Sequence, residues 1–174
     1  MREPIHTIWV HGSPAQAVAH AVLEISSRRP ALCISGINDG ENLGATNLIS
    51  GTVGGAAEAA GFGIPSLAVS IGPEGHPMFG QPFGQPYCQE NWSVAAAVIR
   101  RFASLALRGG LPPRVDFLNI NIPWTATGET EIRTTSQSRQ NHYVCTKPGL
   151  RDFSTPLRLP VTEQIDVSRL ELDR

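Results

Sequence analysis

The chain has 174 residues, a formal net charge of −1 and 41% hydrophobic residues, a composition that supports one domain with a buried core and an appended arm. The near-balanced charge argues against a nucleic-acid duplex or an anionic membrane as partner, and the apolar stretches are far shorter than a membrane span. Its cysteines, Cys33, Cys88 and Cys145, form no C-x-x-C pair, so we expect free thiols and a cytoplasmic location.

The first predicted elements are a strand and a helix. Residues 7–10 (TIWV) are a short apolar run typical of a buried strand. Ser13 can then cap a helix, with Pro14 at its first position and Gln16 completing a capping box. Apolar residues at helical spacing extend this predicted helix to about residue 27, and a proline ends it.

Three further strands follow, separated by two helices. Residues 31–35, 66–71 and 115–122 are continuous apolar runs, as expected for strands of a parallel sheet. A helix is predicted over residues 52–60, with Gly61 just beyond its end. The next helix begins after Asn91, and its buried stripe is predicted to consist of Val94, Val98, Ile99, Phe102 and Leu105.

The alternation of strands and helices predicts an open, mostly parallel α/β sheet with helices on both faces. We assign residues 1–124 to this core. Residues 125–174 are polar and lack periodicity, so they are interpreted as an extended arm or hairpin region.

A candidate ligand site lies in the segment 36–51, which follows a predicted strand and leads into a helix. Ligands of open α/β sheets bind at the carboxyl ends of the strands. Ser50, Gly51 and Thr52 stand at the predicted helix start, where backbone N–H groups and the helix dipole favour an anion. Asn38 and Asn42 offer amide oxygens of the kind that Mg²⁺ or Mn²⁺ accepts.

The same segment also has a purely structural interpretation. Glycine and asparagine are common in loops because they tolerate positive φ, and a Ser-Gly-Thr sequence at a helix start is often only a cap. Gly54 and Gly55 are costly within a helix unless the helix packs very closely on the sheet. No Walker A or G-x-G-x-x-G pattern occurs, so nucleotide binding of those kinds is not supported.

Several motifs occur in order along the chain: Gly12-Ser13-Pro14, Ser35-Gly36-Ile37-Asn38, Gly40, Asn42-Leu43-Gly44, Ser50-Gly51-Thr52-Val53, Gly63-Ile64-Pro65-Ser66, Ala68-Val69-Ser70 and Leu118-Asn119-Ile120-Asn121-Ile122-Pro123. Together they resemble the SurE family of metal-dependent nucleoside monophosphate phosphatases.

The resemblance implies a role for each candidate residue. Asn38 matches a metal ligand for Mg²⁺ or Mn²⁺, Gly40 and Asn42 match the loop that shapes the site, and Ser50 to Thr52 match the segment that holds the phosphate. The implied substrate is a nucleoside monophosphate or another phosphomonoester. The resemblance also implies a homodimer or homotetramer joined through the arm, which carries Arg133, Arg139 and Arg151.

The chain departs from the family pattern at the acidic metal ligands. The family places an adjacent pair of aspartates after its first strand, whereas this sequence contains no Asp-Asp pair, so no catalytic carboxylate is identified. Asp39 and Glu41 lie in the candidate loop and could substitute for this pair, although we expect them to face solvent. We expect that nothing before residue 7 supplies the family's first strand, and the resemblance implies that this strand belongs in the middle of the sheet.

Two functional hypotheses therefore remain open. The first is a divalent-metal-dependent phosphatase that hydrolyses nucleoside monophosphates, of which this chain is a partial copy. The alternative is a non-catalytic module that binds phosphate, a nucleotide or a partner subunit. Residues 72–90 are rich in proline, glycine and aromatics, and either cover a substrate base through Phe79, Phe83 and Tyr87 or form an ordinary surface loop.

Overall fold

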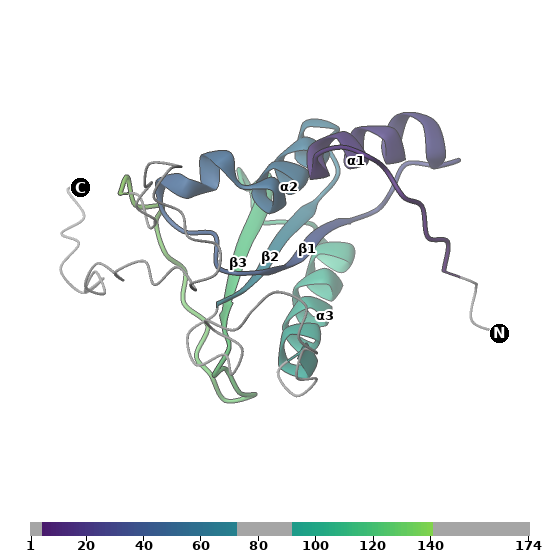
Figure 1. The fold of residues 1–174 in the computed structure, drawn as a ribbon. Coiled ribbons are helices and arrows are strands. Elements are labelled where there is room, and N and C mark those ends of the chain that lie inside the picture. The colour runs from purple at the N-terminus through teal and green to yellow at the C-terminus, as the bar shows by residue number, and fades with distance from the viewer. Residues whose placement is uncertain (1–4, 73–91, 141–174) are drawn as a thin grey trace, which may run out of the picture.

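The computed structural model describes residues 5–72 and 92–140 (Figure 1). In chain order, the elements are α1 (Pro14–His20), the π-helix η1 (Ala21–Ile25), β1 (Cys33–Asp39), the 3-10 helix η2 (Ala45–Ile49), α2 (Gly51–Gly61), β2 (Ser66–Gly72), α3 (Trp92–Gly109) and β3 (Phe117–Pro123). None of the helices in the described residues has the length and apolar character that crossing a bilayer requires.

The strands form an open parallel sheet in the order β1-β2-β3, with α1 and α2 on one face and α3 on the other (Figure 1). This arrangement confirms the predicted fold class. The central strand β2 pairs on both sides, so that Ser70 lies opposite Asn38 of β1 and Asn121 of β3. The carboxyl ends of all three strands consequently meet at one edge of the sheet, which is the edge that carries the candidate site.

The core has a layer on each face of β2. On the α3 side, alternate residues of β2 are buried together with residues of α3, β3 and the turn after β3: Leu67, Val69, Ile71, Ala95, Ile122 and Trp124. On the α2 side, Ala68 packs against Val53 and Ala56. Because β2 is covered on both faces, every residue from Ser66 to Ile71 is buried, which confirms the prediction made from its continuous apolar sequence.

The start of α1 is formed by the predicted capping box. The Gln16 N–H donates to Ser13 Oγ at 3.2 Å, and the Ser13 N–H donates to Gln16 Oε1 at 2.8 Å. The predicted single helix to residue 27 is wrong in its second half, because the α-helix gives way after His20 to the wider turn of η1. That turn closes with a hydrogen bond of 2.8 Å from the Ser26 N–H to the Ala21 carbonyl.

The predicted strand over residues 7–10 is absent. This segment has no strand pairing, and Ile8 and Trp9 are 56% and 90% exposed. A strand requires a neighbour for its backbone hydrogen bonds. Within the described residues, β1 forms the margin of the sheet on this side, and no strand lies beside residues 7–10.

Two predicted boundaries and one position of a predicted helix stripe also need correction. The strand predicted at 31–35 runs from Cys33 to Asp39, since pairing with β2 continues through Asp39 opposite Ile71. The positive-φ residue that follows α2 is Gly63 and not Gly61, which is still helical. In α3, Val98, Ile99 and Phe102 of the predicted stripe pack against the core as expected, whereas Leu105 is 50% exposed. The fully buried positions of this helix are Ala95 and Ala106. The Asn91 cap lies outside the described residues.

Candidate functional site

Asn38 lies near the carboxyl end of β1, in the strand and not in the loop as predicted. Its side-chain Nδ2 donates to the Gly40 carbonyl at 2.7 Å, which curls the chain back immediately after the strand. This bond assigns the NH₂ group to the loop and leaves Oδ1 as the side-chain atom able to accept a hydrogen bond or ligate a cation.

Glycine is required at two places along this strand and loop. Gly36 has φ +126°, and a Cβ there would clash with the Val69 carbonyl oxygen of the neighbouring strand. Gly40 has φ +113°, a conformation that L-residues rarely adopt. Gly40 therefore permits the turn that Asn38 closes, as expected for a residue that shapes the loop.

Asn42 is buried, with only 9% of its surface exposed, and is bound by side chains of two strands. Its Nδ2 donates to Ser70 Oγ at 2.6 Å, and its backbone N–H donates to Asn121 Oδ1 at 2.8 Å. Its carbonyl accepts from Asn119 Nδ2 at 2.9 Å and from Asn121 Nδ2 at 3.0 Å. The visible role of Asn42 is thus to anchor the loop on the sheet, while phosphate contact by this residue stays a prediction.

The two acidic residues of the loop differ in their surroundings. Asp39 is exposed, as expected. Glu41 is half-buried, and its Oε2 atom is out of contact with solvent and close to Gly72, where an added Cβ would lie 3.5 Å away. The expectation that Glu41 faces solvent is therefore wrong, because the loop folds inward over the end of β2.

The start of α2 brings Ser50, Gly51 and Thr52 into one helical turn. Ser50 is the N-cap, and its Oγ accepts from the Val53 N–H at 3.1 Å. In the first turn, the N–H groups before Val53 have no intrahelical acceptor, and they lie where an anion is favoured. Binding of a phosphate there stays a prediction.

Two of the helix glycines have a packing role. A Cβ on Gly51 would lie 3.1 Å from Pro14 Cγ, and one on Gly55 would lie 2.7 Å from Ser35 Oγ and 3.3 Å from Pro14 Cβ. The close approach of α2 to the sheet is confirmed for Gly55, whereas a Cβ on Gly54 would meet no atom within 4 Å. The absence of a Cβ at Gly51 thus has a structural reason that does not depend on a ligand.

The residues brought together fall into two groups. Hydrogen bonds join Asn38 to Gly40, and Asn42 to β2 and β3, whereas Ser50 begins a helix that follows η2. Residues 5–72 and 92–140 contain no cluster of three or more His, Cys, Asp or Glu side chains able to hold a metal ion. Mg²⁺ is usually bound through at least one carboxylate, so a single neutral Asn38 oxygen does not fit a complete site.

Sequence reasoning missed Ser70, Asn119 and Asn121 as residues of this edge. The usable signal was polar side chains at alternate positions of otherwise apolar strands, since alternate residues of a strand share one face. Asn119 and Asn121 belonged to the motif LNINIP, but only the register of β2 with β3 places Asn121 beside Ser70.

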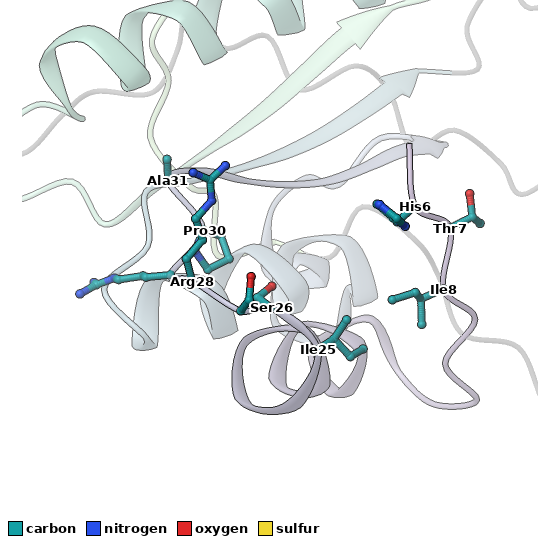
Figure 2. A pocket seen from close by; sticks show the side chains of 10 residues that line it. His6, Thr7, Ile8, Ile25, Ser26, Arg28, Pro30 and Ala31 are labelled. Atoms are coloured by element: carbon teal, nitrogen blue, oxygen red, sulfur yellow. The ribbon is translucent and has the colours of Figure 1, made fainter. Parts of the chain in front are cut away.

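A hollow of about 750 Å³ lies elsewhere in the structure. Figure 2 shows its lining between the extended N-terminal segment and the connection that leads into β1. The lining residues are His6, Thr7, Ile8, Ile25, Ser26, Ser27, Arg28, Arg29, Pro30 and Ala31. None of the predicted site residues contributes to it, so this hollow gives no support to the candidate site.

Several predictions concern residues of the arm and of segment 72–90. Arg133 forms an ion pair with Glu131 at 2.9 Å, and Arg139 is exposed. Phe79, Phe83, Tyr87 and Arg151 lie outside the described residues. Subunit contacts through the arm and the division at residue 124 stay predictions.

Comparison with known proteins finds extensive similarity. The family model described as "Survival protein SurE" matches residues 2–144. The 5'-nucleotidase SurE of Methanothermobacter thermautotrophicus is 44% identical over 148 residues, which cover 84% of this chain and 55% of that protein. The 5'-nucleotidase SurE of Methanosarcina acetivorans is 38% identical over 134 residues, covering 75% of this chain and 49% of that protein.

A solved structure supports the fold. The crystal structure of the SurE protein from Aquifex aeolicus matches with a TM-score of 0.56 and 32% sequence identity, over 76% of this chain and 48% of that one. The chain thus spans about half the length of the curated relatives it matches. The matched region contains every candidate residue from Asn38 to Thr52.

Proposed function

The chain belongs to the SurE family, and from this premise we propose that it supplies part of a divalent-metal-dependent phosphatase that hydrolyses nucleoside monophosphates. The observation that carries the proposal is the 38–44% identity to proteins named 5'-nucleotidase SurE across the region that contains the candidate loop and the start of α2. Other phosphomonoesters carry the same phosphate group, which is the part of the substrate that these residues would recognise.

The phosphate is assigned to the first turn of α2. Its N–H groups and the positive end of the helix dipole favour a dianionic phosphate, and the hydroxyl groups of Ser50 and Thr52 are available nearby. The Gly51 N–H belongs to the same turn, and Gly40 and Asn42 hold the preceding loop in place. These residues would bind and orient the substrate.

Asn38 is assigned as one ligand of the divalent cation, Mg²⁺ or Mn²⁺. A divalent cation in a phosphatase neutralises charge on the phosphoryl group. The described residues supply one amide oxygen and no acidic cluster, so they do not complete its coordination. Carboxylates or other oxygen donors would have to complete the coordination.

The test is binding and turnover of AMP by the chain, with Mn²⁺ and with EDTA. Calorimetry is expected to show AMP binding that tightens with Mn²⁺, and phosphate release is expected only with the metal present. Thr52→Ala and Asn38→Ala are each expected to weaken AMP binding about tenfold, the effect of losing one charge-assisted contact. Thr134→Ala, an exposed threonine of the arm, is the matched control.

A non-catalytic module that binds phosphate, nucleotide or a partner subunit is the second candidate. It is favoured by the lack of an acidic cluster among the residues that the structure describes. AMP binding that is unaffected by Mn²⁺ and yields no phosphate would support this module and contradict the phosphatase. Assembly as a homodimer or homotetramer and a cytoplasmic location belong to the proposal as well, and light scattering of the purified chain measures the former.

A further inference from the structure

The loop after β1 has two glycines with positive φ and one anchored residue between them. Gly40 and Gly44 have φ values of +113° and +55°, and Asn42 lies between them. Glycines lose the most backbone entropy when a loop is ordered, so a loop with two of them needs specific contacts to adopt one conformation. Backbone bonds hold the two ends of the loop, from the Gly40 N–H to Ile71 and from the Ala45 N–H to Gln140, and the hydrogen bonds of Asn42 hold its middle.

Asn121 binds both backbone groups of Asn42 with one side chain. Its Oδ1 accepts from the Asn42 N–H at 2.8 Å, and its Nδ2 donates to the Asn42 carbonyl at 3.0 Å. A carboxamide carries the same donor and acceptor as a peptide group, so this side chain replaces a neighbouring strand at that point. The two residues are 79 positions apart, so the contact ties β3 to the loop directly.

Asn119 makes only one of these two hydrogen bonds to the Asn42 backbone. Its Nδ2 donates to the Asn42 carbonyl at 2.9 Å, but it makes no bond to the Asn42 N–H. Removing Asn119 leaves that carbonyl with the Asn121 donor, whereas removing Asn121 leaves the part-buried N–H of Asn42 without its acceptor. A buried donor that loses its only acceptor is far more costly than an acceptor that retains one of two donors.

The anchored loop also determines how Asn38 is held. Asn38 Nδ2 donates to the Gly40 carbonyl, and the Gly40 N–H donates to the Ile71 carbonyl at 2.8 Å. The direction of the Gly40 carbonyl depends on the next residues of the loop, which end at the Asn42 anchor. A loop released at Asn42 would therefore free the Asn38 side chain as well.

We propose that Asn121 is the positioning residue of this site: it fixes the loop between Asn38 and α2 and thereby sets the orientation of the Asn38 amide. The part of the proposal that concerns ligand affinity rests on the proposed function. The part that concerns the loop does not, because it is defined by the Asn42 and Asn38 contacts alone.

The experiment compares Asn121→Ala and Asn119→Ala with Ser66→Ala in the full chain, labelled with ¹⁵N. Ser66→Ala is the matched control because it removes another buried hydrogen bond, 2.6 Å from Ser66 Oγ to the Ala56 carbonyl, at the opposite end of β2. NMR reports the exchange rate of the Asn42 amide proton and the signal of the Asn38 side-chain NH₂ group. Calorimetry with AMP and Mn²⁺ reports affinity.

Asn121→Ala is expected to speed Asn42 amide exchange by about tenfold or more and to shift the Asn38 side-chain signal, with a smaller change in Asn119→Ala. Ser66→Ala is expected to lower the urea midpoint without moving either signal. If Asn121→Ala does not fold, Asn121→Asp replaces it: the carboxylate keeps the acceptor for the Asn42 N–H but places a negative oxygen against the Asn42 carbonyl, and the Asn38 signal is expected to shift.

Unchanged Asn42 exchange and an unchanged Asn38 signal in the Asn121 variant would overturn the proposal, whatever the affinity for AMP. AMP binding weakened about tenfold in Asn121→Ala, and by less than about twofold in Ser66→Ala, would support the link to ligand affinity, whereas equal affinities would overturn that link. A wild-type chain that binds no AMP would contradict the proposed function, and the two NMR signals would still decide whether Asn121 positions the loop.

Discussion

The central strand β2 and the N-terminal segment 5–10 carry similar apolar sequences in opposite environments. Leu67, Val69 and Ile71 are at most 1% exposed, whereas Ile5 and Trp9 are 94% and 90% exposed. The difference is that β2 has a hydrogen-bonded strand on each side and a helical layer on each face. Apolar side chains alone therefore do not make a strand, because the backbone also needs partners for its N–H and C=O groups.

The sharpest test of this comparison is a pair of isoleucines. Ile71→Ala is expected to lower the free energy of unfolding by about 2–5 kcal/mol, because it opens a cavity in the α3-side core. Ile5→Ala is expected to change it by less than about 0.5 kcal/mol, because the side chain is already in water. Urea unfolding measures both, and equal losses would show that segment 5–10 is packed in solution.

A pair of glycines tests how closely β1 approaches β2, with Gly36 at this contact and Gly54 in α2 as the comparison. Gly36→Ala is expected to cost about 2–4 kcal/mol, because its Cβ would clash with the Val69 carbonyl oxygen and its φ is +126°. Gly54→Ala is expected to stabilise the chain by about 0.5–1 kcal/mol, since a Cβ meets nothing within 4 Å in this helix. Thermal unfolding compares them, and a harmless Gly36→Ala would contradict the close contact of β1 with β2.

A pair of serines tests whether the capping box stabilises the N-terminus of α1. Ser13→Ala is expected to lower the free energy of unfolding by about 1 kcal/mol, because it removes the Ser13 Oγ that accepts from the Gln16 N–H in the capping box of α1. Ser27→Ala, an exposed serine after η1, is the control and is expected to change it by less than about 0.5 kcal/mol. Urea midpoints that fall equally would show that the cap does not stabilise α1.

The smallest expected effect concerns Cys33, the first residue of β1. Burial raises the pKa of the Cys33 thiol above its ordinary value, since the thiolate would lose hydration. Alkylation of the folded chain, with Cys88 and Cys145 replaced by serine, is expected to require a higher pH than in urea. Because the pKa of this thiol is higher in the folded chain than in the unfolded chain, the free energy of unfolding falls as the pH rises above the unfolded pKa. Coincident pH profiles in both states would contradict this burial.

The sequence predicted the parts of the fold that depend on neighbours in the chain. The capping box at Ser13 and Gln16 needs only three residues, and the continuous apolar run of β2 indicates burial on both faces. The candidate site was predicted in part: Asn38, Gly40 and Asn42 lie at the carboxyl edge as expected, and Ser50 is the N-cap of α2. Phosphate and metal contacts of these residues stay predictions.

What the sequence by itself determined about this protein is its class, an α/β sheet of parallel strands, and the SurE motifs that lie along it. Only the tertiary structure decided that segment 7–10 is not a strand, that Glu41 turns inward, and that Asn121 holds Asn42. The physical reason is how far apart in the sequence the interacting residues lie. A cap or an apolar period involves residues a few positions apart, whereas strand pairing and the Asn121 contact require segments distant in the sequence to meet in one register.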